Sequence, residues 1–218
     1  MSGVLAIALY TAAMLHAGGA GSGLPEMAAS LAATTPVARA DAYLAGMAGG
    51  PADEPAGTSA RRAEDPLRRP MELATALGSG GGLAAVVGVT ALVDPGAALS
   101  AAEAGVGTGL VTLAHKTVLG RARPPAGAGP YTMTGPLSLE DLYQSLPSGH
   151  TSGATAVFGA LGRAFPSAAP ALEAVGVLVG LSRVYLGLHW PSDVAAGRGL
   201  GTWWAEAAAD NRGGAPVR

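Results

Sequence analysis

The feature that most constrains the fold is an uncharged stretch from Leu73 to Val93. At 1.5 Å per residue, a helix over this stretch is about long enough to cross the hydrocarbon core of a bilayer. Its glycines, which include Gly78 and residues 80–82, make it a poor isolated helix. Buried glycines are nevertheless tolerated where helices pack together in a membrane bundle. We therefore expect one helix over this stretch, in a protein built from packed helices.

Four further segments continue the helical pattern, and no strand-like alternation persists along the sequence. They are Ala97 to Arg121, Gly149 to Phe165, Pro170 to Leu188 and Pro191 to Ala209. Hydrophobic residues make up 49% of the chain and charged residues 13%. Alanine and glycine dominate the apolar fraction, which favours closely packed helices because small residues let backbones approach. The prediction is an all-α bundle of about six helices, embedded in a membrane, with the active site at one end.

We expect three regions along the 218 residues. Residues 1–70 would form an N-terminal helix followed by a loop region, residues 71–210 the helical core, and residues 211–218 a polar tail. Residues 4–17 form a short apolar run that no Lys or Arg precedes, so a signal-peptide core, a first membrane helix and a buried helix all stay open. Residues 50–70, which contain four prolines and a dense group of charges, predict a surface loop.

Charge placement bears on the membrane prediction. After Asp94, no uncharged stretch within a predicted helix reaches the roughly 18 residues usual for a membrane helix. However, Arg163 lies near the C-terminal end of one predicted helix and Glu173 near the N-terminal end of the next. Helix dipoles favour each charge at those ends, where the membrane interface would also lie. The interruptions therefore weigh little against a membrane bundle.

Composition excludes several function classes. The formal net charge is −2 and no basic stripe occurs, so no nucleic-acid partner is expected. The chain has no cysteine, which excludes disulfides and thiolate metal sites. Only one of its thirteen cationic residues is a lysine, Lys116. No feature of the sequence specifies an oligomeric state.

The first motif is the segment from Lys116 to Pro124. Lys116 and Arg123 are two helical turns apart, so on a helix that Pro124 ends they would point from one face. Two cations near a helix end favour a clamp for a phosphate, in which Arg binds through its planar fork and Lys as a point charge. The alternative for this segment alone is a solvated basic face.

The second motif is Leu146-Pro-Ser-Gly-His-Thr151. Ser148 is a good N-cap for the helix that follows, and the free amides of Gly149 and His150 would lie at its N-terminus, where anions bind. His150 beside such a site can protonate a leaving oxygen. An ordinary capped helix with a partly buried histidine is the alternative.

The third motif runs from Ser182 to Asp193. Pro191 suits the first turn of a helix, and Asp193 follows His189 by four residues within that turn. The carboxylate can then reach one imidazole nitrogen and leave the other free to attack, as in catalytic triads. Arg183 adds a third cation from the preceding helix. A helix–turn–helix corner with a surface ion pair would explain the His–Asp pair but not Arg183.

The order K-x6-R-P, then P-S-G-H, then S-R-x5-H-x3-D resembles the signature of the type 2 phosphatidic-acid phosphatase superfamily. This superfamily includes lipid phosphate phosphatases, bacterial nonspecific acid phosphatases and vanadium haloperoxidases. All three motifs are complete and in order, and the resemblance covers about residues 72 to 205.

The resemblance implies a role for each motif residue. His189 attacks phosphorus, Asp193 orients it, and His150 protonates the leaving oxygen and then activates water. The phosphate oxygens would be bound by Lys116, Arg123, Arg183, Ser148 and Gly149. No carboxylate cluster lies near the motifs, so no metal or other cofactor is expected.

Other candidate residues match no signature position. His115 and Arg121 are interpreted as local surface or as neighbours of the site residues. Arg198 lies about one turn past Asp193 and is interpreted as a partner of the membrane interface. Trp203 and Trp204 are assigned to an interfacial belt or to core packing.

The resulting hypothesis is a metal-independent phosphatase that hydrolyses a lipid phosphate or prenyl diphosphate through a phospho-histidine intermediate. Undecaprenyl diphosphate, phosphatidylglycerol phosphate and phosphatidic acid are the candidate substrates. The alternatives are a soluble or periplasmic nonspecific acid phosphatase and a non-catalytic membrane protein that binds phospholipid; a vanadium haloperoxidase is disfavoured.

The predicted location is the cell membrane, as a multi-pass protein. The basic loop from Arg61 to Arg69 would put the site in the cytoplasm if the helices simply alternate. Similarity to bacterial cell-envelope enzymes points to the periplasm or outside, which is the orientation we expect.

Overall fold

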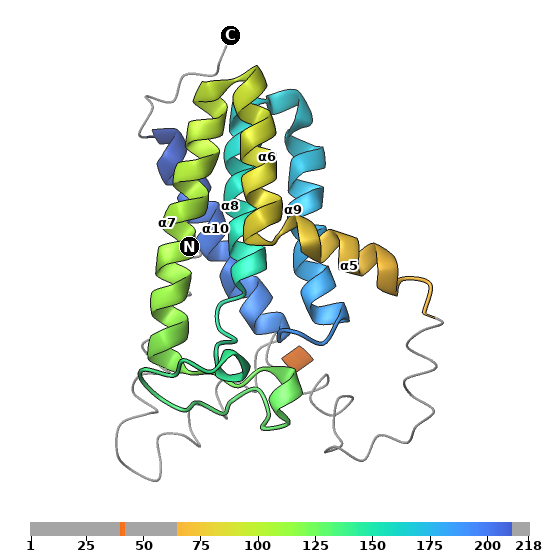
Figure 1. Ribbon diagram of the computed structural model, residues 1–218, viewed down its shortest axis with the longest axis vertical. Helices are drawn as coiled ribbons and strands as arrows, with labels where there is room; N and C mark the ends of the chain where they lie inside the picture. Colours follow the sequence, from red (N-terminus) through yellow and green to blue (C-terminus); the bar gives the residue numbers. More distant parts are fainter. Residues whose placement is uncertain (1–39, 42–64, 211–218) are drawn as a thin grey trace.

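The computed structural model describes residues 40–41 and 65–210, and residues 65–210 contain six α-helices and no β-strand (Figure 1). The helices are α5 (Arg68–Leu77), α6 (Gly80–Val93), α7 (Pro95–Leu119), α8 (Gly149–Ala164), α9 (Ala169–Tyr185) and α10 (Pro191–Asp210). Single 3₁₀ turns, η1 (Pro124–Ala126), η2 (Asp141–Tyr143) and η3 (Pro166–Ala168), interrupt the connections. The prediction of an all-α bundle of about six helices is confirmed.

Helix boundaries follow local capping chemistry. Ser79, Asp94 and Ser148 cap α6, α7 and α8 by accepting the backbone N–H of the third residue along. Pro95 occupies the first turn of α7, where its missing N–H costs nothing. Gly120 adopts the left-handed conformation at φ 59° and ends α7. The α7 helix therefore ends before Arg121, and Pro124 does not end it as the sequence predicted.

The prediction of a single helix from Leu73 to Val93 is wrong. The chain breaks at Gly78 and Ser79 into α5 and α6, which are bent by 62° relative to each other. The Ser79 side chain accepts the Gly82 N–H at 3.0 Å and starts a new helix at that point. In Figure 1, α5 projects sideways from the base of α6. Since α5 begins at Arg68, it also takes in the end of the predicted surface loop.

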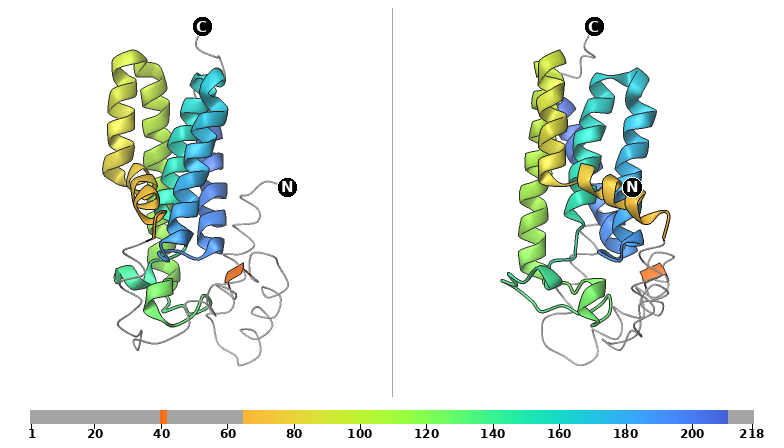
Figure 2. Two further views of the ribbon diagram at one scale, coloured as in Figure 1. Left: turned by 90° about the vertical axis from the view of Figure 1, so that its right-hand side faces the viewer. Right: turned by 45° about the vertical axis from the view of Figure 1, so that its right-hand side comes forward.

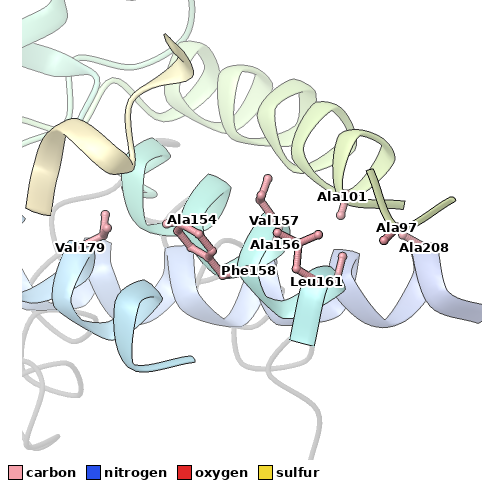
Figure 3. Close-up of a cluster of buried hydrophobic side chains, with 11 residues drawn as sticks. Ala97, Ala101, Ala154, Ala156, Val157, Phe158, Leu161, Val179 and Ala208 are labelled. Carbon is pink, nitrogen blue, oxygen red and sulfur yellow. The ribbon is translucent and has the colours of Figure 1, made fainter. Parts of the chain in front are cut away.

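Helix α8 lies at the centre of the bundle and packs against α7, α9 and α10. The shared core contains mostly small residues with Phe158, Val157 and Leu161 (Figure 3). A Cβ at Gly201 of α10 would lie 2.4 Å from the carbonyl oxygen of Ser152, and one at Gly197 would lie 2.7 Å from that of Ser148. Glycine at both positions lets α10 approach the backbone of α8, as the composition suggested.

The outer surface of the bundle is strongly apolar. Helix α6 buries none of its residues, and Leu92 and Val93 are 86% and 79% exposed. Leu99, Leu110 and Leu113 along α7 are exposed as well. By length and composition α7 and the segment Pro166–Tyr185 can each cross a membrane, and the bent α5–α6 pair gives up to a third span. Apolar area of this extent suits lipid contact rather than water.

Predictions for residues 1–39, 42–64 and 211–218 lie outside the described residues. They include the nature of the apolar run at residues 4–17, most of the predicted surface loop at residues 50–70 and the polar tail.

Candidate active site at the loop end of the bundle

The three motifs meet at one end of the bundle, called here the loop end, where the connections from α7 to α8 and from α9 to α10 lie (Figures 1 and 2). Hydrogen bonds to backbone carbonyls join them. The Ser148 N–H donates to the Asp193 carbonyl at 3.0 Å, and the Trp190 indole N–H donates to the Ala122 carbonyl at 2.8 Å. The structure thus brings together segments that are far apart in the sequence.

A tight turn after α9 places His189. Gly187 has φ 66°, and the chain folds back so that the His189 N–H donates to the Arg183 carbonyl at 3.2 Å. Helix α10 then starts at Pro191, with Asp193 in its first turn. The Nδ1 atom of His189 lies 3.3 Å from Oδ2 of Asp193, and both side chains are buried. Since Nδ1 faces the carboxylate, Nε2 is the ring nitrogen left for chemistry.

The carboxylate of Asp193 is held on both oxygens. Oδ2 accepts the Trp190 N–H at 2.9 Å and the Ser145 hydroxyl at 2.5 Å, besides facing His189. Oδ1 accepts a guanidinium N–H of Arg121 at 2.7 Å. Both oxygens of this buried group are thereby engaged, which fixes the carboxylate in one orientation.

Protonation states follow from this environment. Burial by itself raises the pKa of Asp193, but the charge of Arg121 and the hydrogen bonds from His189 and Ser145 outweigh it and lower the pKa to about 2. Burial lowers the pKa of His189 to about 4, although Asp193 opposes this shift. At neutral pH the pair is therefore a carboxylate and a neutral imidazole, the form in which Nε2 is a nucleophile.

Lys116 and Arg123 converge by a route other than the one predicted. Lys116 lies in the last turn of α7, but Arg123 lies beyond the left-handed Gly120 in the following loop, so the two do not share a helix face. Both nevertheless donate to the Gln144 carbonyl, Arg123 at 3.4 Å. Arg123 also pairs with Asp141 at 2.8 Å, and that carboxylate is largely exposed.

Arg183 comes from the last turn of α9, where one guanidinium nitrogen donates to the Thr75 hydroxyl at 2.7 Å. Within residues 40–41 and 65–210, neither Arg183 nor Lys116 has a carboxylate within salt-bridge distance, although both are largely buried. In the same residues, Nε of Arg123 and Nε of Arg183 are buried without a hydrogen-bond partner. Buried guanidinium donors normally find acceptors, so these atoms suit an anion.

Helix α8 contributes the second motif. Ser148 is fully buried and caps the helix, accepting the Thr151 N–H at 3.4 Å and its hydroxyl at 2.9 Å. A Cβ at Gly149 would lie 3.9 Å from Cε of Lys116, so the start of α8 lies close to the Lys116 side chain. Burial, together with the nearby Arg183, His189, Lys116 and Arg123 side chains, lowers the pKa of His150 to about 4. The field at the helix N-terminus is therefore strongly positive.

All eight predicted site residues lie at the loop end. Of three further residues in the same hydrogen-bond network, Arg121 was interpreted as local surface or as a neighbour of the site, and Ser145 and Asp41 were not singled out. Arg121 is fully buried and not on the surface, and it bonds directly to Asp193. Ser145 bonds to Asp193, and Asp41 pairs with Arg121 at 3.1 Å. The position of Arg121, two residues before Arg123 in the first motif, could have indicated that it lies near the site. Neither Ser145 nor Asp41 has such a position in the sequence.

The other residues that the sequence analysis singled out make contacts of their own outside the three motifs. Arg198 pairs with Glu173 on an exposed face at 2.6 Å, and His115 bonds to the Val111 carbonyl of its own helix. Trp203 and Trp204 stack edge to face with ring centroids 5.0 Å apart. Among the residues that the structure describes, no group of three or more His, Asp or Glu side chains is arranged to hold a metal ion.

Comparison with known proteins matches this chain to a family of phosphatases and to individual phosphatases. The model of the PAP2 superfamily matches residues 97–210, a range that contains all eight predicted site residues. A lipid A 1-phosphatase of Rhizobium etli is 37% identical over 100 residues, which cover 45% of this chain and 43% of the relative. One of Rhizobium johnstonii is 36% identical over 100 residues, which cover 45% and 41%. The match thus spans less than half the length of these relatives.

Two further similarities are informative. A non-specific acid phosphatase of Salmonella typhi is 47% identical over 57 residues, which cover 26% of this chain and 23% of the relative. Among solved structures, a transmembrane PAP2-type phosphatidylglycerolphosphate phosphatase from Bacillus subtilis has the same fold with a TM-score of 0.54 and 21% identity. That alignment covers 86% of this chain and 92% of the other.

Proposed function

Because the chain belongs to the PAP2 superfamily, we propose that it is a phosphatase that hydrolyses a phosphate ester of a membrane lipid through a phospho-histidine intermediate. One observation carries the proposal. The imidazole of His189 faces a fixed carboxylate with Nδ1 at 3.3 Å, at the end of the bundle where Lys116, Arg123 and Arg183 gather.

In the first step, Nε2 of His189 attacks phosphorus and the bond from phosphorus to the ester oxygen breaks. His150 donates a proton to the departing alkoxide, which leaves as the alcohol. The phosphorylated imidazole bears positive charge, and the ionised Asp193 at its Nδ1 side stabilises that charge. The neutral ground state of His189 gives the lone pair that this step requires.

In the second step, His150, now neutral, takes a proton from water as the water oxygen attacks phosphorus. The N–P bond breaks, inorganic phosphate leaves, and His189 and His150 return to their starting states. The same side chain acts as acid and then as base, as in other two-step hydrolases.

The cations provide the electrostatic part of the mechanism. Phosphoryl transfer depends mostly on positioning and on stabilising charge at the equatorial oxygens. Three fixed cations and the Gly149 amide supply this stabilisation, which Mg²⁺ supplies in other phosphotransfer enzymes. We propose that the reaction needs no metal ion. Ser148 contributes by capping α8 and so fixing the direction of the amide.

A lipid substrate is supported by the surface of the bundle. The exposed leucines and valines of α6 and α7 suit lipid chains, and a site at one end of such a bundle would lie near the headgroups. The relatives named lipid A 1-phosphatase point to a glycolipid phosphate as one candidate. Phosphatidic acid, phosphatidylglycerol phosphate and undecaprenyl diphosphate are the others. We propose a multi-pass membrane protein with its site facing outward.

The similarity to the acid phosphatase favours a second candidate, a phosphatase of small soluble esters. Measuring phosphate release from lipid and soluble substrates distinguishes the two candidate functions. Wild-type protein in mixed micelles should release phosphate from lipid phosphates at higher kcat/KM than from p-nitrophenyl phosphate, and His189→Ala should release none from either. A preference for the soluble ester would favour the second candidate, and wild-type protein without any activity would refute both. Extraction from membranes only with detergent would support the membrane location.

A further inference from the structure

Arg121 lies at the centre of a buried polar network that includes Asp193, and the proposed mechanism gives Arg121 itself no role. Its guanidinium donates from Nε to the Pro130 carbonyl at 2.6 Å, and one terminal nitrogen donates to both Ser192 Oγ at 2.6 Å and Asp193 Oδ1 at 2.7 Å. The other terminal nitrogen donates to Asp41 Oδ2 at 3.1 Å. The side chain is fully buried, so these contacts fix its plane.

Asp41 comes from a distant part of the chain, 80 residues before Arg121, and lies outside the region that matches the family. Its carboxylate is 1% exposed. Besides Arg121, it accepts the Ser192 N–H at 3.0 Å and the Ser192 hydroxyl. Asp41 therefore holds both groups that position Asp193. One is the guanidinium of Arg121, which bonds to the Asp193 carboxylate, and the other is the first turn of α10, which contains Asp193.

The chemistry of the network favours a role in catalysis over one in stability. Burying two carboxylates and a guanidinium costs desolvation energy that well-packed apolar residues would avoid, so such clusters are weak evidence for stability. Here one end of the cluster contacts the carboxylate that faces His189. A carboxylate that can rotate away from the imidazole loses both the tautomer and the charge stabilisation it provides.

We infer that Arg121 and Asp41 are positioning residues for phosphoryl transfer: Arg121 holds the Asp193 carboxylate against His189, and Asp41 holds Arg121 and the first turn of α10. The inference rests on the proposed function. It assigns part of the active site to a segment that precedes the family region, and neither residue touches the substrate.

The first test is Asp41→Asn, which keeps the shape of the side chain but removes its charge and replaces one accepting oxygen with an N–H donor. Its matched control is Glu206→Gln, the same chemical change in an exposed ion pair with Arg163 that lies away from the loop end. We expect kcat to fall by about tenfold or more, the size of effect seen when an outer partner of a metal-binding histidine is removed, with KM nearly unchanged. The control should keep wild-type values.

The second test separates positioning from a purely structural role. If Asp41 acts through Asp193, then Asp41→Asn should add little further loss to a protein that already carries Asp193→Asn. A role in folding alone would lower activity by the same factor in both backgrounds. Arg121→Lys, which keeps the charge but loses the planar fork, should behave like Asp41→Asn.

The outcomes are distinct. Wild-type turnover by Asp41→Asn overturns the inference and leaves the proposed function intact, and so does an equal loss in both backgrounds. Should Asp41→Asn fail to fold, Asp41→Glu and Arg121→Lys are measured instead: lowered kcat with unchanged KM supports the inference, and wild-type kcat overturns it. Wild-type protein without phosphatase activity removes the proposed function and this inference with it.

Discussion

Gly78, at the bend between α5 and α6, lies directly against His150. A Cβ built at Gly78 would be 3.1 Å from the His150 carbonyl oxygen and 2.4 Å from a methyl group of the fully buried Val179. From the same short helix, Thr75 accepts the hydrogen bond of Arg183. The bend in what the sequence presents as one apolar stretch therefore forms a wall of the candidate active site.

The substitution Gly78→Ala should lower both stability and turnover. Inserting a methyl group into this contact forces Val179 or α8 to move, at a cost of about 1–3 kcal/mol. A shift of α8 displaces His150. The matched control is Gly88→Ala on α6, where an added Cβ meets nothing within 4 Å and should leave thermal stability equal or higher. Thermal unfolding and phosphate release check the pair, and wild-type values for Gly78→Ala would contradict the packing described here.

Asp193→Asn should keep the fold but lower kcat by orders of magnitude, about ten-thousand-fold in the comparable case of a triad aspartate. The amide cannot enforce the tautomer with Nε2 free, and it cannot stabilise the positive phospho-imidazole. Circular dichroism establishes folding, and steady-state kinetics measures the loss. The exposed Glu173→Gln is the control. Turnover near the wild-type rate would remove Asp193 from the mechanism.

Activity should depend on pH with an acidic optimum for kcat/KM. His189 must be neutral, and its pKa is lowered to about 4, so protonation abolishes attack below about pH 4. His150 must be protonated, and its pKa is also lowered to about 4 in the free protein, so kcat/KM falls as pH rises above that value. A bound phosphate anion raises the pKa of His150, because it offsets the surrounding cations.

The alkaline limb of kcat should therefore lie at higher pH than that of kcat/KM. Profiles from pH 3 to 9 for wild type and His150→Gln test this, since ionisation of the substrate is common to both proteins. An alkaline limb unchanged in His150→Gln would assign the proton to another group.

Orthovanadate should inhibit the enzyme and EDTA should not. Vanadate adopts the five-coordinate geometry of the transferring phosphoryl group, and an anion-binding pocket of fixed cations should bind it tightly. Inhibition by vanadate should weaken in Arg183→Ala, which removes one of those cations. Loss of activity in EDTA that added Mg²⁺ restores would show that a metal takes part after all.

The sequence predicted the all-helical fold, and it predicted which motif residues lie together better than it predicted where the helices begin and end. His189 and Asp193 were paired correctly because four residues, with the aspartate in a first helical turn, are enough to define that contact. Lys116 and Arg123 reach one carbonyl although the helix assumed to align them ends at Gly120. Their convergence depends on a left-handed turn that an isolated glycine only hints at.

The long-range contacts of Arg121 were not predictable. Arg121 meets Asp193 across 72 residues and Asp41 across 80, and no local pattern in the sequence links Arg121 to either partner. The sequence does contain one indication of the bend at Gly78, because Ser79 is a good N-cap within an apolar run. Hydrophobicity is continuous across it, however, and indicated an unbroken span.

The most direct test of the account is to trap the covalent intermediate. With ³²P-labelled p-nitrophenyl phosphate, whose leaving group needs no protonation, the first step should proceed in His150→Ala while hydrolysis of the intermediate is slow. We expect protein-bound label that is stable in alkali and lost in acid, transient in wild type, accumulating in His150→Ala and absent from His189→Ala. Continued turnover in His189→Ala, or label that remains in it, would contradict the assignment of His189 as the nucleophile.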